Sequence, residues 1–372
     1  MGNKKVIAVL FGGRSTEHEV SLTSASYVLE NIDKDRYESI PVLLTREGEW
    51  LLCYNPLVRQ KNGLIQEMKN SYPAMPPVIL DYTGGGKLLE KKNLSKTHPI
   101  DVLFPVLHGT YGEDGTIQGL AKMADIPCVG AGVMASAAGM DKVIMKNLFI
   151  MSGLPVVPFI FFTRTEWHQN RQEVLKKIEE KFSFPVFVKP ANGGSSIGIS
   201  KVKRMSDIDA AILEASRFDR KIIVEQGINA RELECGILGN ETPKASAVGE
   251  IIPEREFYDE IAKYEEDSTK TPIPANLDKK NTQKIQEMAI QAFLAIDSAG
   301  FARVDFFMDK ISQKIYVNEI NTIPGFTSIS MYPKMWQASG ISYQNLITNL
   351  IELSIQRFEE EKSEVKFISG KA

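Results

Sequence analysis

Strand-like and helix-like segments alternate along the chain. Residues 6–11 form an uninterrupted apolar run typical of a buried strand, and residues 20–31 follow with apolar positions at helical spacing. Residues 101–107 and 116–124 repeat this order. The alternation predicts an α/β fold, in which ligands bind beyond the carboxyl ends of the strands.

The alternation continues after residue 130, and the charged tail after residue 360 is expected to fray. Further helices are expected at residues 134–151, 165–180, 281–299 and 343–359. Further strands are expected at residues 156–162, 185–189, 221–226, 232–238, 302–308 and 314–320. The last two strands are predicted to pair as a hairpin. Residues 252–277 carry charges and prolines without a sustained period, which is typical of a long functional loop.

Composition excludes several classes of protein. The 372 residues exceed what one core usually supports, so two or three domains are expected. A net charge of −3 argues against a nucleic-acid partner and favours a small-molecule ligand. Three widely separated cysteines fit a reducing compartment. The most apolar window, residues 147–162, is short and broken by prolines, so a soluble cytoplasmic protein without a membrane span is expected.

Polar side chains gather on the predicted hairpin. Arg303 and Asp305 stand two residues apart on its first strand, and Glu319 and Asn321 do so on its second, so each pair shares a face of the sheet. Burying such a face without a counter-ion is costly, and its oxygen atoms suit a Mg²⁺ ion that carries substrate phosphates. The alternative is an exposed face whose charges meet water.

Loops after three other strands carry further candidate chemistry. Lys189 ends a strand and precedes the Gly- and Ser-rich residues 190–198, which could offer a charge and backbone N–H groups to phosphate. An ordinary hairpin turn is the alternative, and the order of residues is wrong for a P-loop. Glu17 and His108 follow strands in Gly-containing loops, where together they could bind an amino acid's ammonium group. Alternatively, Glu17 complements a helix dipole and His108 is a core residue.

Eight stretches spread along nearly the whole chain resemble one family of enzymes. They are GGRSTEHEVS, HGTYGEDGTIQG, MDK, VKPANGGSSIGISKV, VEQGINARELECGILGN, FYDEIAKY, GFARVDFFMD and NEINTIPGFTSISMYPKMW. In this order and spacing they resemble the ATP-grasp superfamily and, within it, the D-alanine–D-alanine ligases. The resemblance implies that two D-alanines are joined through an acyl phosphate at the expense of ATP, for peptidoglycan synthesis, by a cytoplasmic homodimer.

The resemblance also implies a three-domain ATP-grasp architecture. Residues 1–130 would form an N-terminal parallel-sheet α/β domain that binds substrate. Residues 131–226 would form a central α+β subdomain with the phosphate loop. Residues 227–372 would form a C-terminal α+β subdomain with the lid loop and the metal site. The last two would clasp ATP, and residues 55–96 are assigned no chemistry.

Carried over residue by residue, the resemblance implies a full set of site residues. Two Mg²⁺ or Mn²⁺ ions would bind Asp305, Glu319 and Asn321. ATP would contact Lys142, Lys189, Ser195, Ser196, Glu225, Gln226, Ile228, Glu232, Lys263 and Phe307. The two D-alanines would contact Glu17, His108, Arg303, Gly325 and Ser330. Residues placed in the catalytic set are Glu17, Ser195, Tyr264, Arg303 and Gly325.

Three alternatives to this function stay open. Related ligases join D-alanine to D-lactate, and the presence of Tyr264 together with Met331 after Ser330 favours the dipeptide over that product. Other carboxylate–amine ligases of the superfamily differ in the amino acids that trigger phosphate release. A nucleotide-binding regulator without catalysis would show a gap among the four polar hairpin residues, and the sequence has none.

Overall fold

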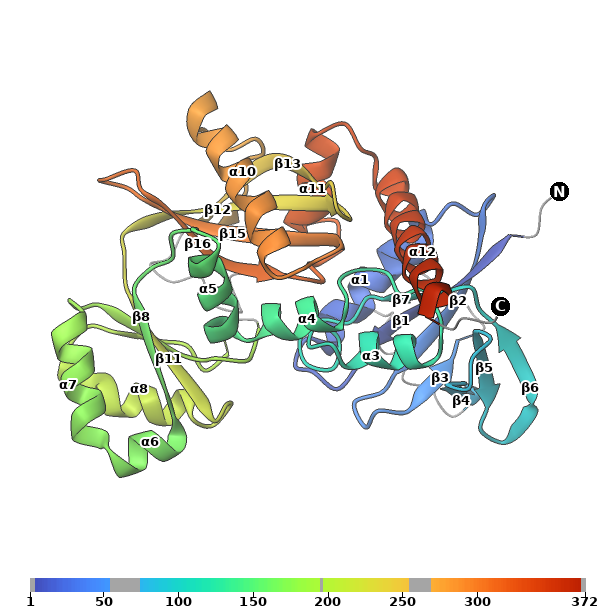
Figure 1. The fold of residues 1–372 in the computed structure, drawn as a ribbon, viewed down its shortest axis with the longest axis horizontal. Helices are drawn as coiled ribbons and strands as arrows, with labels where there is room; N and C mark the ends of the chain where they lie inside the picture. Colours follow the sequence, from blue (N-terminus) through green and yellow to red (C-terminus); the bar gives the residue numbers. More distant parts are fainter. Residues whose placement is uncertain (1–3, 54–73, 195–196, 254–268, 369–372) are drawn as a thin grey trace.

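The strands of the protein form three separate sheets. The computed structural model describes residues 4–53, 74–194, 197–253 and 269–368. Within these residues the sheets have seven, four and five strands, in chain order. The first sheet lies at one end of the molecule, in blue and cyan, and the other two lie at the opposite end (Figure 1).

The first sheet is mixed, with parallel strands at one side. Its strands and nearby helices are β1 (Lys5–Gly12), α1 (His18–Asn31), β2 (Tyr37–Leu44), β3 (Trp50–Leu52), β4 (Pro77–Leu80), β5 (Lys87–Glu90), β6 (Asn93–Pro99), β7 (Val102–Pro105) and α3 (Thr116–Met123). β1 is parallel to β2 and β7, as predicted, and is buried on both faces. The other neighbours in the order β6-β5-β4-β3-β2-β1-β7 are antiparallel, because several connecting turns are too short for a crossover.

The second sheet is antiparallel and follows two short helices. The elements of this part are α4 (Val133–Met140), α5 (Lys142–Met151), β8 (Phe159–Thr163), α6 (Arg164–Gln169), α7 (Arg171–Lys181), β9 (Val186–Pro190), β10 (Ser200–Val202), η2 (Met205–Asp207), α8 (Ile208–Ala215) and β11 (Lys221–Gln226). The strand order is β10-β9-β11-β8. Buried residues of α7 and α8 share one hydrophobic cluster with this sheet.

Two helices expected as single elements are broken by polar residues. Asp141 separates α4 from α5 with an extended backbone, and its side chain accepts hydrogen bonds from the first N–H groups of α5. Asn170 separates α6 from α7 with φ −128° and ψ 36°, outside the helical region. Apolar periodicity continues across both breaks, so it did not reveal them.

The third sheet contains the predicted hairpin. Its elements are β12 (Ala230–Gly239), β13 (Lys244–Pro253), β14 (Thr269–Lys270), α10 (Lys279–Ala295), β15 (Gly300–Asp309), β16 (Ile315–Asn321) and α11 (Met331–Ala338). The strand order is β14-β13-β12-β15-β16, and β15 pairs with β16 antiparallel. α10 buries Ile285, Met288 and Phe293 in the same hydrophobic cluster as the sheet, on the face expected from the sequence.

The segment expected as a loop at residues 252–277 contains two short paired stretches. Ile252 lies opposite Lys270 in the antiparallel pair of β13 and β14. Residues 254–268 lie outside the described part of the chain. Among the described residues, no helix is both long and apolar enough to cross a membrane. The division into domains 1–130, 131–226 and 227–372 stays a prediction.

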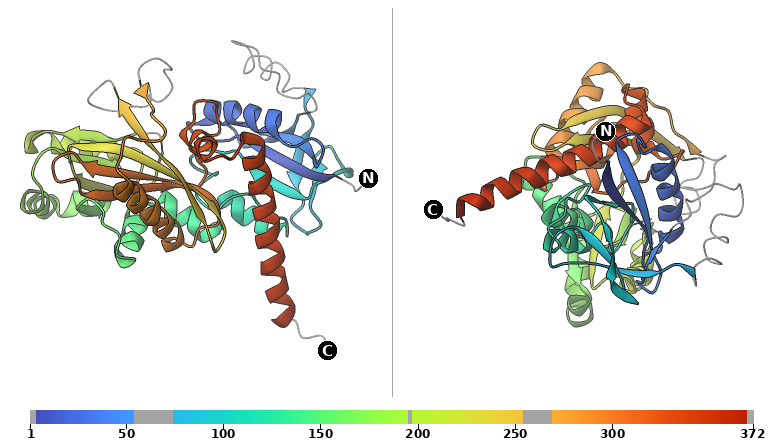
Figure 2. Two further views of the ribbon diagram at one scale, coloured as in Figure 1. Left: turned by 90° about the horizontal axis from the view of Figure 1, so that it is seen from above. Right: turned by 90° about the vertical axis from the view of Figure 1, so that its right-hand side faces the viewer.

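The last helix, α12 (Tyr343–Ile368), returns to the first sheet. Leu346, Ile347, Leu350 and Ile351 are buried in the same hydrophobic cluster as β1 and β7. The helix continues beyond residue 360, where fraying was expected, and it projects away from the body of the molecule (Figure 2). Arg357 holds it in place by donating hydrogen bonds to the backbone oxygens of residues 128 and 130.

Leu350→Ala tests the packing of α12 on the first sheet. Leu350 is fully buried, so truncation should lower the free energy of unfolding by about 2–5 kcal/mol through lost burial and a residual cavity. Urea denaturation followed by tryptophan fluorescence measures the change. Glu359→Ala, at an exposed position on the same helix, is the control. Equal stability of the two variants would contradict the observed packing.

Candidate active site

One cavity of about 1100 Å³ collects the residues that the sequence singled out. It is lined by residues of the second and third sheets and by loops and a helix that adjoin the first sheet. The predicted residues that line it are Glu17, His108, Lys142, Lys189, Glu225, Gln226, Ile228, Glu232, Arg303, Asp305, Phe307, Glu319, Asn321, Gly325 and Ser330. Ser195, Ser196, Lys263 and Tyr264 lie outside the described residues. The cavity is therefore the candidate active site.

The hairpin residues lie on two rungs of the ladder between β15 and β16, separated by the pair of Val304 and Ile320. Arg303 is paired with Asn321, and Asp305 is paired with Glu319. Alternation along each strand places all four side chains on the face that lines the cavity. The alternative of a hairpin face turned to water is therefore wrong.

Asp305 is the centre of a dense set of hydrogen bonds. Arg303 donates two of them, from Nε and Nη2, each 2.7 Å long. The Asn321 amide donates a third at 3.0 Å. Arg303 also lies 3.2 Å from the Glu234 carboxylate. These neighbours outweigh burial and raise the pKa of Arg303 well above its ordinary value, so the guanidinium is a permanent cation.

The same hairpin face offers oxygen ligands to a hard cation. Among the described residues there is no cluster of three or more His, Cys, Asp and Glu side chains placed to hold a metal ion. Asp305 and Glu319 are two paired carboxylates, and the Asn321 amide lies two residues along β16 on the same face. Asp305 accepts hydrogen bonds from both Arg303 and Asn321, which hold its carboxylate in place. This set fits Mg²⁺, which takes one or two carboxylates and completes its shell with water and phosphate.

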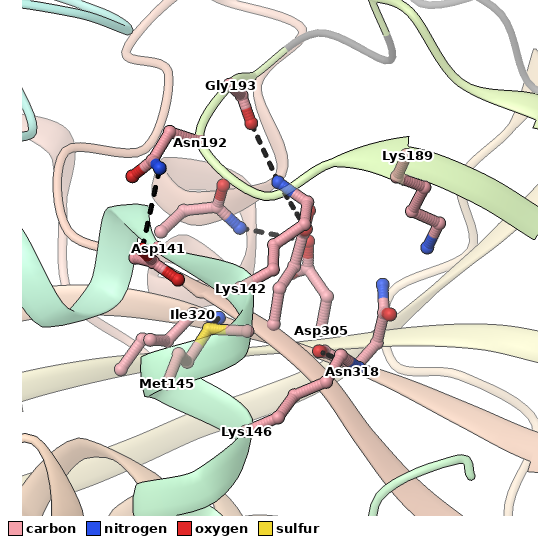
Figure 3. Close-up of polar contacts among 12 residues, drawn as sticks. Asp141, Lys142, Met145, Lys146, Lys189, Asn192, Gly193, Asp305, Asn318 and Ile320 are labelled. Carbon is pink, nitrogen blue, oxygen red and sulfur yellow. Dashed lines mark hydrogen bonds and ion pairs between the residues drawn. The ribbon is translucent and has the colours of Figure 1, made fainter. Parts of the chain in front are cut away.

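The start of α5 connects the phosphate-loop candidate to the hairpin. Lys142 is the first residue of α5, and its Nζ donates to the Gly193 oxygen at 2.7 Å and lies 3.8 Å from Glu319 Oε2. Figure 3 shows Asp141 and Lys142 side by side below the turn at Asn192 and Gly193. The turn therefore lies next to the carboxylates of the hairpin, as a phosphate-binding loop beside a metal site requires.

Lys146 is a buried charged residue that the sequence reasoning missed. It lies one helical turn after Lys142, and its side chain is 1% exposed. Nζ lies 2.9 Å from Glu225 Oε1 and donates to the Asn318 oxygen at 2.9 Å. The sequence feature that could have revealed its burial is a lysine among the mostly apolar residues of the predicted helix. Lys146 thus joins β11 of the second sheet to β16 of the third.

Glu225 lies between two lysines at the base of the cavity. Lys189 donates to its Oε2 at 2.5 Å, and Lys146 contacts its Oε1. Burial opposes ionisation of this carboxyl, but the two ammonium groups outweigh it and lower the pKa of Glu225 to about 2. Burial likewise opposes the charge of Lys189, yet Glu225 raises the pKa of this lysine above its ordinary value. Glu225 is therefore an ionised side chain that only accepts hydrogen bonds.

The residues expected around a nucleotide base lie at the junction of β11 and β12. Phe307 and Glu232 are directly paired between β15 and β12. The Gln226 side chain is occupied elsewhere, because it exchanges hydrogen bonds with the backbone of Ser183. A ligand would therefore meet the backbone at this position. Phe187 also lines the cavity and was missed by the sequence reasoning.

The side chain of Glu17 lies close to the loop that contains Gly109 and to the loop that contains Gly194. It occupies the N-cap position of α1, but its side chain makes no capping hydrogen bond. A Cβ added at Gly109 or Gly194 would lie 2.8 or 2.9 Å from Glu17 Oε2, so both glycines permit its close approach. Its carboxylate lines the cavity. The alternative of a carboxylate that only complements the helix end does not explain this placement.

His108 and Glu113 lie beside Glu17. His108 is buried, and burial lowers its pKa despite the neighbouring Glu17. Burial and the same neighbour raise the pKa of Glu113 well above its ordinary value, so this carboxyl is held protonated. Sequence reasoning missed Glu113, although it belongs to the same Gly-rich loop as His108. Glu17 is thus flanked by a neutral ring and a neutral carboxyl.

Gly325 and Ser330 belong to the loop that follows β16. Ser330 Oγ accepts a hydrogen bond from the Thr327 N–H at 2.9 Å, which closes this loop on itself. A Cβ at Gly325 would lie 2.8 Å from Ser330 Oγ. Both residues line the cavity. Close packing therefore requires glycine at position 325.

Comparison with known proteins covers nearly the whole chain. A family model described as D-ala D-ala ligase N-terminus matches residues 6–131, and one described as D-ala D-ala ligase C-terminus matches residues 148–352. The D-alanine–D-alanine ligase of Acetivibrio thermocellus is 48% identical over 373 residues. The match covers 98% of this chain and 99% of that protein.

Solved structures give the same result. The D-alanine–D-alanine ligase from Coxiella burnetii matches with a TM-score of 0.86 and 36% identity, over 99% of both chains. The VanG D-Ala:D-Ser ligase from Enterococcus faecalis matches with a TM-score of 0.82 and 37% identity, over 95% of this chain and 100% of that one. The three-sheet fold is thus the expected ATP-grasp architecture. The chain belongs to the D-alanine–D-alanine ligase family.

Proposed function

We propose that this protein joins two D-alanines into D-alanyl-D-alanine and converts ATP to ADP and phosphate, as a step of peptidoglycan precursor synthesis. The observation that carries the proposal is the single cavity with three kinds of group. It contains lysines beside a Gly-rich turn, paired carboxylates on a hairpin, and an arginine next to a glycine-containing loop. An ATP-dependent ligase of carboxylate and amine needs all three.

The nucleotide occupies the half of the cavity between the second and third sheets. Lys142 and Lys189 contact phosphate, together with the turn at residues 192–197. Asp305, Glu319 and Asn321 would hold Mg²⁺ or Mn²⁺, with two ions expected, and the metal would offset the negative charge of the ATP phosphates. Glu232 accepts hydrogen bonds from the ribose hydroxyls, and Phe307 packs against the base.

Glu225 gives this half of the cavity its preference for adenine. The two lysines that flank it keep it ionised, so it offers only acceptor atoms. An ionised carboxylate accepts a hydrogen bond from the exocyclic amino group of adenine and repels the carbonyl oxygen that guanine has at the same position. The backbone of Gln226 and Ile228 contacts the rest of the base edge.

The two amino acids occupy the other half, between the first and third sheets. Glu17 binds the ammonium group of the first D-alanine, and the neutral ring of His108 adds no repulsion. A carboxylate oxygen of the first D-alanine attacks the γ-phosphorus of ATP. A P–O bond forms to this oxygen, and the bond between the γ-phosphorus and the ADP oxygen breaks. The second D-alanine is placed by Ser330, and its deprotonated amine attacks the acyl carbon. The C–N bond forms as phosphate leaves.

Arg303 and the Gly325 N–H stabilise the tetrahedral oxyanion between these events. Donors of this kind contribute roughly 3–4 kcal/mol each in well-characterised enzymes. Two hydrogen bonds to Asp305 fix the guanidinium plane, which therefore needs little reorganisation in the transition state. Lys263, Tyr264 and Ser195 are assigned to the lid and the phosphate loop that exclude water from the acyl phosphate.

The cysteines support a mechanism without a covalent enzyme intermediate. Cys53, Cys128 and Cys235 are buried, and burial raises their pKa values to about 11, about 12 and about 12. They are thus protonated thiols away from the cavity, unsuited to act as nucleophiles. A cytoplasmic homodimer is the expected form of the enzyme, because the reaction draws on cellular ATP and the resemblance implies a dimer.

A phosphate-release assay tests the proposed function. With ATP and Mg²⁺, D-alanine alone should support continuous phosphate release and the formation of D-alanyl-D-alanine, detected by mass spectrometry. D-Serine and D-lactate serve as competing second substrates. The D-serine arm is included because the VanG relative is a D-Ala:D-Ser ligase. No phosphate release with D-alanine would contradict the proposal. Faster release with D-serine or D-lactate would show that this compound, and not D-alanine, is the preferred second substrate.

Glu319→Ala tests the metal assignment. Loss of one of the two paired carboxylates should lower kcat for ATP turnover at least about 100-fold, because the phosphates would lose their metal-bound charge compensation. Glu241→Ala, in the exposed turn between β12 and β13, is the matched control and should turn over ATP at the wild-type rate. Wild-type kinetics of the Glu319 variant would refute the assignment.

Glu225→Gln tests the buried ion pairs by their pH dependence. The pKa of Glu225 is about 2 in the fold against an ordinary 4.5, so its charge stabilises the fold above pH 4.5, by on the order of 3 kcal/mol. This contribution is lost as the pH falls from 4.5 to 2. The difference in free energy of unfolding between wild type and variant, measured in urea, should shrink over the same range. A difference independent of pH would contradict the ion pairs.

A further inference from the structure

Ser24 is a buried residue of α1 that joins two loops of the cavity. It is fully buried, and its Oγ lies 3.0 Å from His108 Nε2. The same oxygen accepts a hydrogen bond from the Phe326 N–H at 3.3 Å. His108 lies in the loop of the first substrate site, and Phe326 directly follows Gly325. One hydroxyl therefore connects the two ends of the proposed substrate half of the cavity.

The hydrogen bonds around His108 determine where its proton lies. Nδ1 is 3.0 Å from the Ile323 carbonyl oxygen, which can only accept, so Nδ1 carries the hydrogen. In a neutral ring Nε2 then has a free lone pair, and the Ser24 hydroxyl donates to it. The Ser24 oxygen remains available to the Phe326 N–H. All four groups are satisfied by this single assignment.

A protonated ring would break this arrangement. A hydrogen on Nε2 would point at the Ser24 hydroxyl, which would have to turn away and lose its acceptor. Burial already favours the neutral ring, and Arg303 acts in the same direction, while Glu17 and the Ile323 carbonyl oppose it. Glu113, the other acid in this region, is held protonated by burial and by Glu17. The Ser24 hydrogen bond thus adds to the preference for neutral imidazole.

We propose that Ser24 is a positioning residue, which donates to Nε2 of the neutral Nδ1–H form of His108 and ties the ring to the loop that carries the Gly325 N–H. This proposal rests on the proposed function for its kinetic consequence. The substrate ammonium then meets the carboxylate of Glu17 beside an uncharged ring. The oxyanion donor on Gly325 is held in register with that site, because Ser24 is hydrogen-bonded to His108 and to Phe326, the residue after Gly325.

A second contact from the same helix supports the connection. Tyr27 lies one turn after Ser24 on α1, and its Oη donates to Ser328 Oγ at 2.6 Å. The loop after β16 is therefore held by α1 at residues 326 and 328, and by His108 at residue 323. The first sheet and the third sheet are joined through these hydrogen bonds beside the substrate half of the cavity.

Ser24→Ala in the full chain tests the proposal. The protein has only four histidines, so ¹⁵N-histidine NMR resolves their tautomers, and His108→Gln assigns the signal. The wild type should show His108 as the Nδ1–H tautomer, and Ser24→Ala, which removes the donor to Nε2, should shift the resonance of this nitrogen downfield, towards that of a lone pair without a hydrogen bond. The Michaelis constant for the first D-alanine should rise about 10-fold, the worth of one or two hydrogen bonds, and that for ATP should stay within about 2-fold.

Ser26→Ala is the matched control. Ser26 is also buried on α1, but its hydroxyl donates only to the Thr23 oxygen of its own helix. It should leave both the His108 spectrum and the first Michaelis constant at wild-type values. If Ser26→Ala reproduces the changes of Ser24→Ala, the effect is a loss of helix stability and the proposal is wrong.

Other outcomes also decide the matter. An Nε2–H tautomer in the wild type, or wild-type spectra and kinetics in Ser24→Ala, would overturn the proposal. If Ser24→Ala fails to fold, Ser24→Cys, whose thiol is a weaker donor, should show a downfield shift of the Nε2 resonance and a raised Michaelis constant for the first D-alanine. A wild-type Nε2 resonance together with a wild-type Michaelis constant in Ser24→Cys would overturn the proposal. If the wild type makes no dipeptide, the proposed function fails, while the spectra still decide the tautomer assignment.

Discussion

The burial of Glu225 between Lys146 and Lys189 constrains the rest of the structure. Removing three charges from water costs several kcal/mol per ion unless their geometry is well matched. The three groups come from α5, β9 and β11, and Lys146 also donates to the Asn318 oxygen on β16. The match therefore forms only when α5, the second sheet and the third sheet meet at one point. That meeting point is the floor of the nucleotide half of the cavity.

From this floor the charges of the cavity are arranged for a ligand. Lys142 lies one turn before Lys146 and faces the Gly-rich turn, while Asp305 and Glu319 face it from the hairpin. Lys142 and Glu319 remain 3.8 Å apart, farther than the direct contacts around Asp305. Lys142 Nζ and Glu319 Oε2 are thus at ion-pair distance, and cationic groups that suit phosphate line the same space as carboxylates that suit a metal ion.

Sequence patterns predicted the parts of the site that obey a local rule. The period of two placed Arg303 and Asp305 on one face, and strand pairing then aligned them with Asn321 and Glu319. Lys146 was missed because its partners lie far along the chain and no local spacing points to them. The same reason applies to α12, which the sequence predicted as a helix without indicating that it packs on the first sheet. Helix breaks such as Asp141 depend on caps that apolar periodicity does not record.

The substrate half of the cavity depends on contacts between sheets, since no single element carries its groups. Glu17 and His108 come from loops of the first sheet, whereas Arg303 and Gly325 belong to the third sheet and the loop after it. Ligation requires the acyl carbon, the amine and the oxyanion donors to be aligned closely, and small misplacements cost large factors in rate. The buried hydrogen bonds of His108 with Ile323 and of Ser24 with Phe326 cross this boundary. They therefore join the loops that carry the proposed substrate residues, although none of these four residues is proposed to take part in bond formation.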